Sequence, residues 1–187
     1  MNLSDKIWVT RKARIFTEKR LKKNALLSEL FIIVFSLLMV FSSIWNLKYP
    51  NQNINFLLIC GAVALLVVSI FLSSQKFIER AHIMRNCYIS LDELYLKVKN
   101  HEKSPNPEAI VDYQKNYNDI LLNIDNHSPY DYLCLRHSLR NNNNTTLPPF
   151  TRIDYIHFII EKAVRILLIM LLFSSPFILT AVLKEIL

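Results

Sequence analysis

Three long apolar segments dominate the sequence. Residues 30–47, 56–72 and 166–183 are almost entirely apolar, and none of them contains Asp, Glu, Lys, Arg or His. A helix of roughly 20 mostly apolar residues crosses the hydrocarbon core of a bilayer, which is about 30 Å thick. The rest of the chain is too short to cover three such helices in a soluble core. The pattern therefore predicts three transmembrane helices, of which the first two form a hairpin.

A heptad repeat follows the second apolar segment. Apolar side chains recur there at alternating spacings of four and three residues: Phe77, Ala81, Met84, Tyr88, Leu91, Tyr95 and Val98. No glycine or proline separates this repeat from the second span, so we expect a single helix of about 45 residues. The repeat favours either an oligomerising seam of a coiled-coil stalk or an amphipathic helix packed on its own cytoplasmic neighbours.

Two shorter helices are predicted before the third apolar segment. Residues 101–107 interrupt the long helix, and Asn106 followed by Pro107 indicates the next helix start. The apolar face of that helix contains Ile110, Tyr113, Tyr117, Ile120, Leu121 and Ile124. The sequence at 128–131 (Ser-Pro-Tyr-Asp) has the spacing of a capping box. It predicts a short helix that ends near Arg140.

The final helix begins at a second capping pattern. Thr151 and Asp154 have the spacing that starts a helix, after a loop at residues 141–149 that contains four consecutive asparagines. We expect this helix to continue through the third apolar segment, with a bend near residues 174–176, where two serines precede a proline.

These patterns predict an all-α integral membrane protein with four parts. They are a basic N-terminal helix (1–24), a two-span hairpin (26–75), a long cytoplasmic helical extension with short helices (76–150), and a C-terminal helix that includes the third span (151–187). The net charge is +7, and residues 1–24 carry eight of the 22 lysines and arginines. The loop between the first two spans carries only Lys48. The positive-inside rule therefore places the N-terminus in the cytoplasm and the C-terminus outside.

Composition excludes several classes of activity. Gly61 is the only glycine, so the chain has no Gly-rich loop for a nucleotide phosphate and no nucleophile elbow. The three cysteines, Cys60, Cys87 and Cys134, are an odd number without a C-x-x-C pair. This pattern indicates reduced thiols.

Two small groups of polar residues contain the residue types of a catalytic or metal-binding site, but they lack the spacing that such a site requires. His127, Ser128 and Asp131 are too close together at a helix start to form a hydrolytic triad, and capping explains two of them. Cys134 and His137, with His127 nearby, lack the fourth ligand of a structural zinc site. We therefore assign no catalytic, cofactor-binding or metal-binding residue, and we expect no enzyme activity.

The polar residues of the spans allow two interpretations. The spans contain no charged group of the kind that proton relays and coupled transporters use. Ser36, Ser69 and Ser73 either permit close helix packing or line a weakly selective pore. Glu29, at the inner edge of the first span, either forms an acidic ring in an oligomer or extends to interfacial water.

The basic N-terminal segment also allows two interpretations. Its cations include Arg11, Lys12, Arg14, Lys19, Arg20, Lys22 and Lys23. They favour contact with anionic lipid, because the segment adjoins a span. Phosphate contacts with RNA or DNA are the alternative, and this segment is the only predicted site for nucleic acid.

The architecture and one sequence segment resemble a known group of families. The residues that carry this resemblance are Tyr117, Ile120, Leu121, Asn126, His127, Ser128, Asp131 and Tyr132. Together with the basic helix and the hairpin, they resemble the SLATT families, which are two-span effector domains of bacterial conflict systems. The most similar subtype is the one found beside reverse transcriptases. The resemblance covers residues 5–165, and the third span lies outside the two-span core.

The resemblance implies an oligomeric effector of the bacterial inner membrane that acts in antiphage defence. A partner, such as a reverse transcriptase or another sensor, would trigger it to form pores or disturb the bilayer, which arrests or kills the host cell. The alternative hypothesis is a membrane anchor that recruits a nucleic-acid-processing partner without changing permeability.

Overall fold

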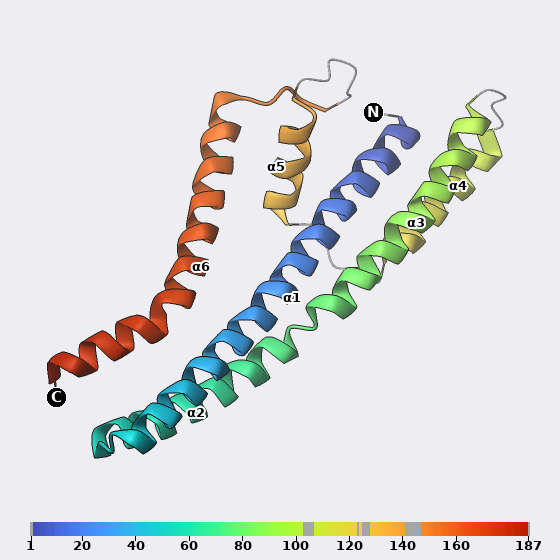
Figure 1. The fold of residues 1–187 in the computed structure, drawn as a ribbon. Coiled ribbons are helices and arrows are strands. Elements are labelled where there is room, and N and C mark those ends of the chain that lie inside the picture. Colours follow the sequence, from blue (N-terminus) through green and yellow to red (C-terminus); the bar gives the residue numbers. More distant parts are fainter. Residues whose placement is uncertain (1, 103–106, 123, 125–127, 141–146, 187) are drawn as a thin grey trace. The chain divides into compact units, whose positions relative to one another are not determined.

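The structure is a computed structural model that describes residues 2–102, 107–122, 124, 128–140 and 147–186. In these residues it contains helices and no strand (Figure 1). The helices are α1 (Leu3–Lys48), α2 (Gln52–Ser74), α3 (Phe77–His101), α4 (Pro107–Leu121), α5 (Pro129–Ser138) and α6 (Arg152–Ile186). Two stretches, one in α1 and one beginning in α2, are long and apolar enough to cross a membrane. The all-α class is therefore confirmed for the described residues, together with two long apolar helices that could span a membrane.

The chain divides into two compact units. Unit 1 contains residues Met1–Lys23 and Phe77–Glu161, and unit 2 contains Asn24–Lys76 and Lys162–Leu187. Both α1 and α6 begin in unit 1 and end in unit 2, while α3, α4 and α5 belong wholly to unit 1.

The first part of α1 is the central helix of unit 1. Ile7 is fully buried in a cluster with Leu91 and Val98 of α3 and Tyr117 of α4. On other faces of the same helix, Ala13 packs with Leu135 of α5, and Leu21 packs with residues of α3. Burial of apolar surface on several faces identifies the basic N-terminal segment as the core of this bundle.

Polar contacts fix how α1 meets α3 and α4. The Ser4 hydroxyl donates to Glu102 at 2.6 Å, and the hydroxyls of Thr10 and Tyr117 lie 2.8 Å apart. Arg11 forms an ion pair with Asp92 of α3. The start of α1 therefore lies beside the end of α3, and the two helices are antiparallel.

The heptad face of α3 is covered within the chain. Ala81, Met84, Leu91 and Val98 are buried, and Phe77, Tyr88 and Tyr95 are partly buried. Cys87 and Leu94, which the repeat does not include, are also buried. This is the arrangement in which the helix packs on its own neighbours. Association of copies through this face stays a prediction.

The expected single helix of about 45 residues is wrong. α2 ends at Ser74 and α3 begins at Phe77. Lys76 adopts the left-handed conformation with φ of 48°, and the backbone N–H groups of Gln75 and Lys76 donate to carbonyls of the last turn of α2. This is a helix-ending conformation that glycine usually supplies. A lysine there costs about 1 kcal/mol, and its sequence context does not reveal it.

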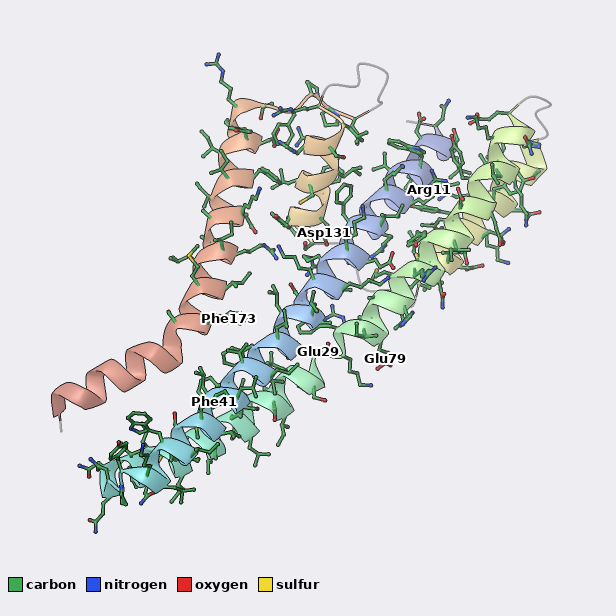
Figure 2. All side chains as sticks on the ribbon, viewed as in Figure 1. Arg11, Glu29, Phe41, Glu79, Asp131 and Phe173 are labelled. Carbon is green, nitrogen blue, oxygen red and sulfur yellow. The ribbon has the colours of Figure 1, made fainter. Side chains whose placement is uncertain are left out.

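The predicted helix starts are found where the structure describes them. Ser128 caps α5 and Asp131 completes the capping box. The N–H of Asp154 donates to the Thr151 hydroxyl, and the Thr151 N–H donates to the Asp154 carboxylate. α6 bends close to Phe173 (Figure 2), as predicted. The Asn106 cap and the asparagine tract lie outside the described residues.

Replacing a core residue of unit 1 tests this packing. Leu91→Ala is expected to lower the free energy of unfolding by about 2–5 kcal/mol, because the fully buried side chain leaves a cavity. Leu96→Ala, on the exposed side of α3 (56% exposed), is the matched control and should change it by less than about 0.5 kcal/mol. Denaturant unfolding of the full chain in detergent, followed by circular dichroism, measures both. Equal effects of the two variants would contradict the burial of Leu91.

Candidate functional site: the apolar hairpin and the Asp131 junction

The turn of the hairpin is closed by a buried asparagine. Asn46, near the end of α1, is only 6% exposed. Its amide donates to the side chain of Asn55, and its oxygen accepts the backbone N–H of Asn51 at 3.0 Å. Asn51 in turn caps α2 by accepting the N–H of Asn53. These bonds satisfy polar groups of a tight turn within the hairpin itself.

Small and flexible side chains allow close packing inside unit 2. The sulfur and terminal methyl of Met39 on α1 lie 3.0 Å from the position that a Cβ on Gly61 would occupy. Glycine therefore permits the two helices to approach closely, as in many helix pairs of membranes. The ring of Phe31 meets that of Phe173 on α6 edge to face, with centroids 5.9 Å apart.

The hairpin leaves nearly all of its apolar surface uncovered. In the most apolar window of α1, 11% of the residues are buried, and in α2 Gly61 is the one buried residue. Large side chains such as Phe41 (Figure 2), Phe56 and Phe71 are more than 60% exposed. A monomeric soluble protein rarely exposes an apolar surface of this extent, whereas a bilayer would solvate it.

The polar residues predicted to line a pore or to aid packing all lie in unit 2. Ser36 and Ser69 are half-buried, and Ser73 and Glu29 are exposed. The Ser69 hydroxyl donates to the carbonyl of Leu66 in its own helix. The hydroxyl therefore needs no polar partner elsewhere. Both interpretations, pore lining and packing, stay predictions.

In unit 1, a buried carboxylate joins α5 to α1 (Figure 2). Asp131 is 1% exposed. It accepts two hydrogen bonds from the guanidinium of Arg20, at 2.8 and 3.0 Å, and one from the Thr17 hydroxyl at 3.0 Å. It also accepts the backbone N–H of Ser128 as part of the capping box. We call these four residues the Asp131 junction.

The junction holds Asp131 in its ionised form. Burial raises the pKa of the carboxyl, but the hydrogen bonds and positive charge of Arg20, with the bonds from Ser128 and Thr17, outweigh burial and lower the pKa below its usual value. A buried carboxylate is stable only with such partners. His127, the other residue of this segment that the triad interpretation considered, lies outside the described residues.

A second ion pair joins α5 to the start of α6. Arg136 donates to both oxygens of Asp154, at 2.9 and 2.7 Å, and to the carbonyl of Pro149. Bonds from Thr151, together with Arg136, lower the pKa of Asp154 to about 2. His137 stacks on Phe158 at a centroid distance of 4.4 Å. This histidine therefore packs among aromatic rings.

The predicted lipid or nucleic-acid contacts divide into two groups. Arg11 pairs with Asp92, Arg20 pairs with Asp131, and Arg14 is 3% exposed, with the Met84 sulfur 3.7 Å away. These three arginines are used inside unit 1. Burial raises the pKa of the nearby Cys87 thiol, and the positive charge of Arg14 partly opposes this rise.

The lysines of the same segment lie nearer the surface. Lys12 lies over the ring of Trp8, Lys19 lies over Phe16, and Lys22 pairs with Glu18 one turn earlier. Lys19, Lys22 and Lys23 are exposed. Contact of these lysines with lipid or nucleic acid stays a prediction.

Sequence reasoning missed two features of the hairpin and the junction. The sequence has four asparagines around the turn, at positions 46, 51, 53 and 55. Nothing in their spacing indicates that the side chain of Asn46 is buried. Arg20 was counted among the cations of the N-terminal segment. Its partner lies far along the chain, and no local spacing connects the two residues.

The described residues define a class of protein: a helical protein that combines a polar bundle with an uncovered two-helix hairpin long and apolar enough to span a membrane. The sequence matches the family described as SMODS and SLOG-associating 2TM effector domain family 5 over residues 1–182, and the chain belongs to this family. The match extends beyond the residues 5–165 of the expected resemblance and includes most of α6. No curated protein and no solved structure matches the chain.

Removing the charge of Asp131 tests the junction. Asp131→Asn is expected to lower the stability of unit 1 by about 1.5–3 kcal/mol, because Arg20 loses charge-assisted hydrogen bonds. Hydrogen exchange of the α5 amides in the full chain measures the loss. Asp112→Asn, at an exposed carboxylate of α4, is the matched control and should change little. If Arg20→Gln and Asp131→Asn had fully additive effects, the pair would not interact.

The α5–α6 ion pair should respond to acid. Because the pKa of Asp154 is lowered from 3.8 to about 2 when folded, its ionised form stabilises the fold at neutral pH, and this contribution is lost as the pH falls from about 4 to about 2. Carboxyl ¹³C NMR titration of the full chain measures the pKa directly. Arg136→Gln should raise it part of the way to 3.8, since the Thr151 bonds remain. A wild-type midpoint near 3.8 would contradict the geometry.

Proposed function

We propose that this chain is an oligomeric effector of the bacterial inner membrane that permeabilises or disrupts the bilayer in antiphage defence. The observation that carries the proposal is the uncovered apolar hairpin of unit 2 in a chain that also folds a polar helical bundle. Membership of a two-transmembrane effector family supports the same conclusion. No catalytic residue has a role in this mechanism.

The proposed topology has a cytoplasmic N-terminus and three spans. The eight cations of residues 1–24 and the single lysine of the external loop support this orientation. In this proposal residues 166–183 of α6, which contain no Asp, Glu, Lys, Arg or His, supply a third span in addition to the two of the family description. Unit 1 would then be cytoplasmic, where a partner can reach it.

In the proposed mechanism, unit 1 restrains the spans until a partner signals infection. The Asp131 junction and the Arg136–Asp154 pair would hold α5 against α1 and α6 in the quiet state. A reverse transcriptase or another sensor would displace these contacts. The spans would then rearrange and conduct ions, which arrests or kills the cell.

Membrane potential in bacteria tests this function. A potential-sensitive dye reports the membrane potential in three kinds of cell. The first expresses the wild-type chain alone and the second expresses Asp131→Asn. The third expresses the chain with its native defence partners and is infected. Asp131→Asn is expected to depolarise cells more than wild type, because its α5 is released more readily. The infected cells with the complete system should also depolarise.

A charge in the span provides the matched control. Val63, in the middle of α2, is 57% exposed, and Val63→Lys places a cation in the hydrocarbon at a cost of about 2.5–3.5 kcal/mol without touching unit 1. Added to Asp131→Asn, it should abolish depolarisation. If none of these cells depolarise although the protein is inserted, the effector function is wrong. Salt-sensitive co-purification of a partner or nucleic acid would then favour the anchor function.

A further inference from the structure

An exposed pair of aromatic rings lies at the turn of the hairpin. Trp45 and Tyr49 are one helical turn apart at the end of α1, where the Tyr49 N–H donates to the Trp45 carbonyl. Their ring centroids are 5.2 Å apart. Trp45 is 64% exposed and Tyr49 is 53% exposed, whereas Asn46 between them is buried in the hydrogen bonds of the turn. The hydrogen-bonded turn therefore holds two large rings that the hairpin itself does not cover.

A lysine lies beside the same pair. The ammonium of Lys48 lies over the Tyr49 ring, 5.3 Å from its centroid, and the side chain is exposed. The negative end of the α1 dipole attracts this charge but leaves it open to a further partner. Residues 30–78 contain no Asp or Glu, so the hairpin supplies no carboxylate to pair with it. The charge of Lys48 is therefore complementary to an anion from outside the hairpin.

The combination of two rings and one cation fits the headgroup region of a phospholipid bilayer. Indole and phenol rings prefer this region, because the ring is apolar while its N–H or O–H needs a polar partner. A lysine at the same level extends its ammonium to the lipid phosphates. A free anion would pair with the lysine but would leave both rings in water. Lipid therefore accounts for all three side chains.

The position of the turn agrees with this partner. Ile44 of α1 and Phe56 of α2 continue the exposed apolar surface from the turn along the two helices of the hairpin. From Asn55 to Gln75 the chain rises about 30 Å at 1.5 Å per residue, which is the thickness of the hydrocarbon core. With the turn at the headgroups of one leaflet, the end of α2 therefore reaches the headgroups of the other.

We infer that Trp45, Lys48 and Tyr49 form a binding surface for phospholipid headgroups, which we call the turn anchor. Lys48 pairs with the lipid phosphate, and the indole N–H and the phenol O–H donate to oxygens of the headgroup or of the acyl esters. The turn anchor fixes the depth of the hairpin in the bilayer. This inference rests on the proposed function, which places the hairpin in a membrane.

The depth of Trp45 in a bilayer tests the inference. Trp8 and Trp45 are the two tryptophans of the chain, so Trp8→Phe leaves one indole. The full chain is placed in vesicles of phosphatidylcholine and phosphatidylglycerol that carry a nitroxide either on the headgroup or at the middle of the acyl chain. The headgroup nitroxide should remove most of the Trp45 emission, and the mid-chain nitroxide should remove little.

A tryptophan in the middle of α2 is the matched control. Val63→Trp, at a position that is 57% exposed, is made in a chain with Trp8→Phe and Trp45→Phe and should show the reverse pattern. Wild type, which retains Trp8, should show the Trp45 pattern at lower amplitude, so the test does not depend on one variant. Stronger quenching of Trp45 by the mid-chain nitroxide would overturn the inference. Absence of quenching by either nitroxide would overturn it in favour of water or a protein partner.

The charge of Lys48 provides a second readout. In the Trp8→Phe chain, quenching by phosphatidylglycerol with a nitroxide near the top of its acyl chain is compared with quenching by the same label on phosphatidylcholine. A lysine at the surface should enrich the anionic lipid around Trp45 roughly five-fold, and Lys48→Gln should remove this preference. Lys97→Gln, at an exposed cation of α3, should keep it. An equal preference with and without Lys48 would overturn the inference.

These measurements use vesicles without a partner, so they are independent of depolarisation in cells. If Trp45 lies at headgroup depth but no form of the chain depolarises cells, the turn anchor stands and the effector function fails. If Trp45 lies at mid-chain depth while Asp131→Asn depolarises cells, the turn anchor fails and the effector function stands.

Discussion

Burial of one carboxylate sets the condition on which unit 1 depends. Asp131 loses its hydration when α5 docks, and Arg20 and Thr17 of α1 replace the lost water with charge and hydrogen bonds. The same carboxylate completes the capping box of α5. One carboxylate therefore both caps α5 and binds it to α1. This double role fixes a single register of α5 against α1. A hydrophobic contact alone would tolerate several registers.

The basic N-terminal segment shows why charge counts are incomplete. Its eight cations predicted a helix on a lipid or nucleic-acid surface, yet Arg14 is 3% exposed and Ile7 is fully buried. The apolar residues between the cations were visible in the sequence. Their partners, such as Leu91 and Leu135, lie on helices far along the chain, and no local pattern identifies them.

Local signals, by contrast, were sufficient for the spans and caps. The two apolar segments and the Ser128 and Thr151 caps depend on neighbouring residues, so the sequence was enough to predict them. The break at Lys76 was missed because a left-handed lysine has no sequence marker. Asn46 was missed because its burial depends on the turn that it helps to form. The structure supplied these two features and the junction of Arg20 with Asp131.

The positions of the hairpin contacts and of the unit 1 core along the chain determine which of them can form first during synthesis. Among the described residues, the hydrogen bonds of Asn46 with Asn51 and Asn55 and the contact of Gly61 with Met39 join residues that precede Lys76. These contacts can therefore form as soon as α2 has been made. The buried face of α1 around Ile7 has its partners in helices that the ribosome produces later. During translation the N-terminal segment is therefore made before the helices that bury it. The hairpin is complete before the bundle of unit 1 can fold.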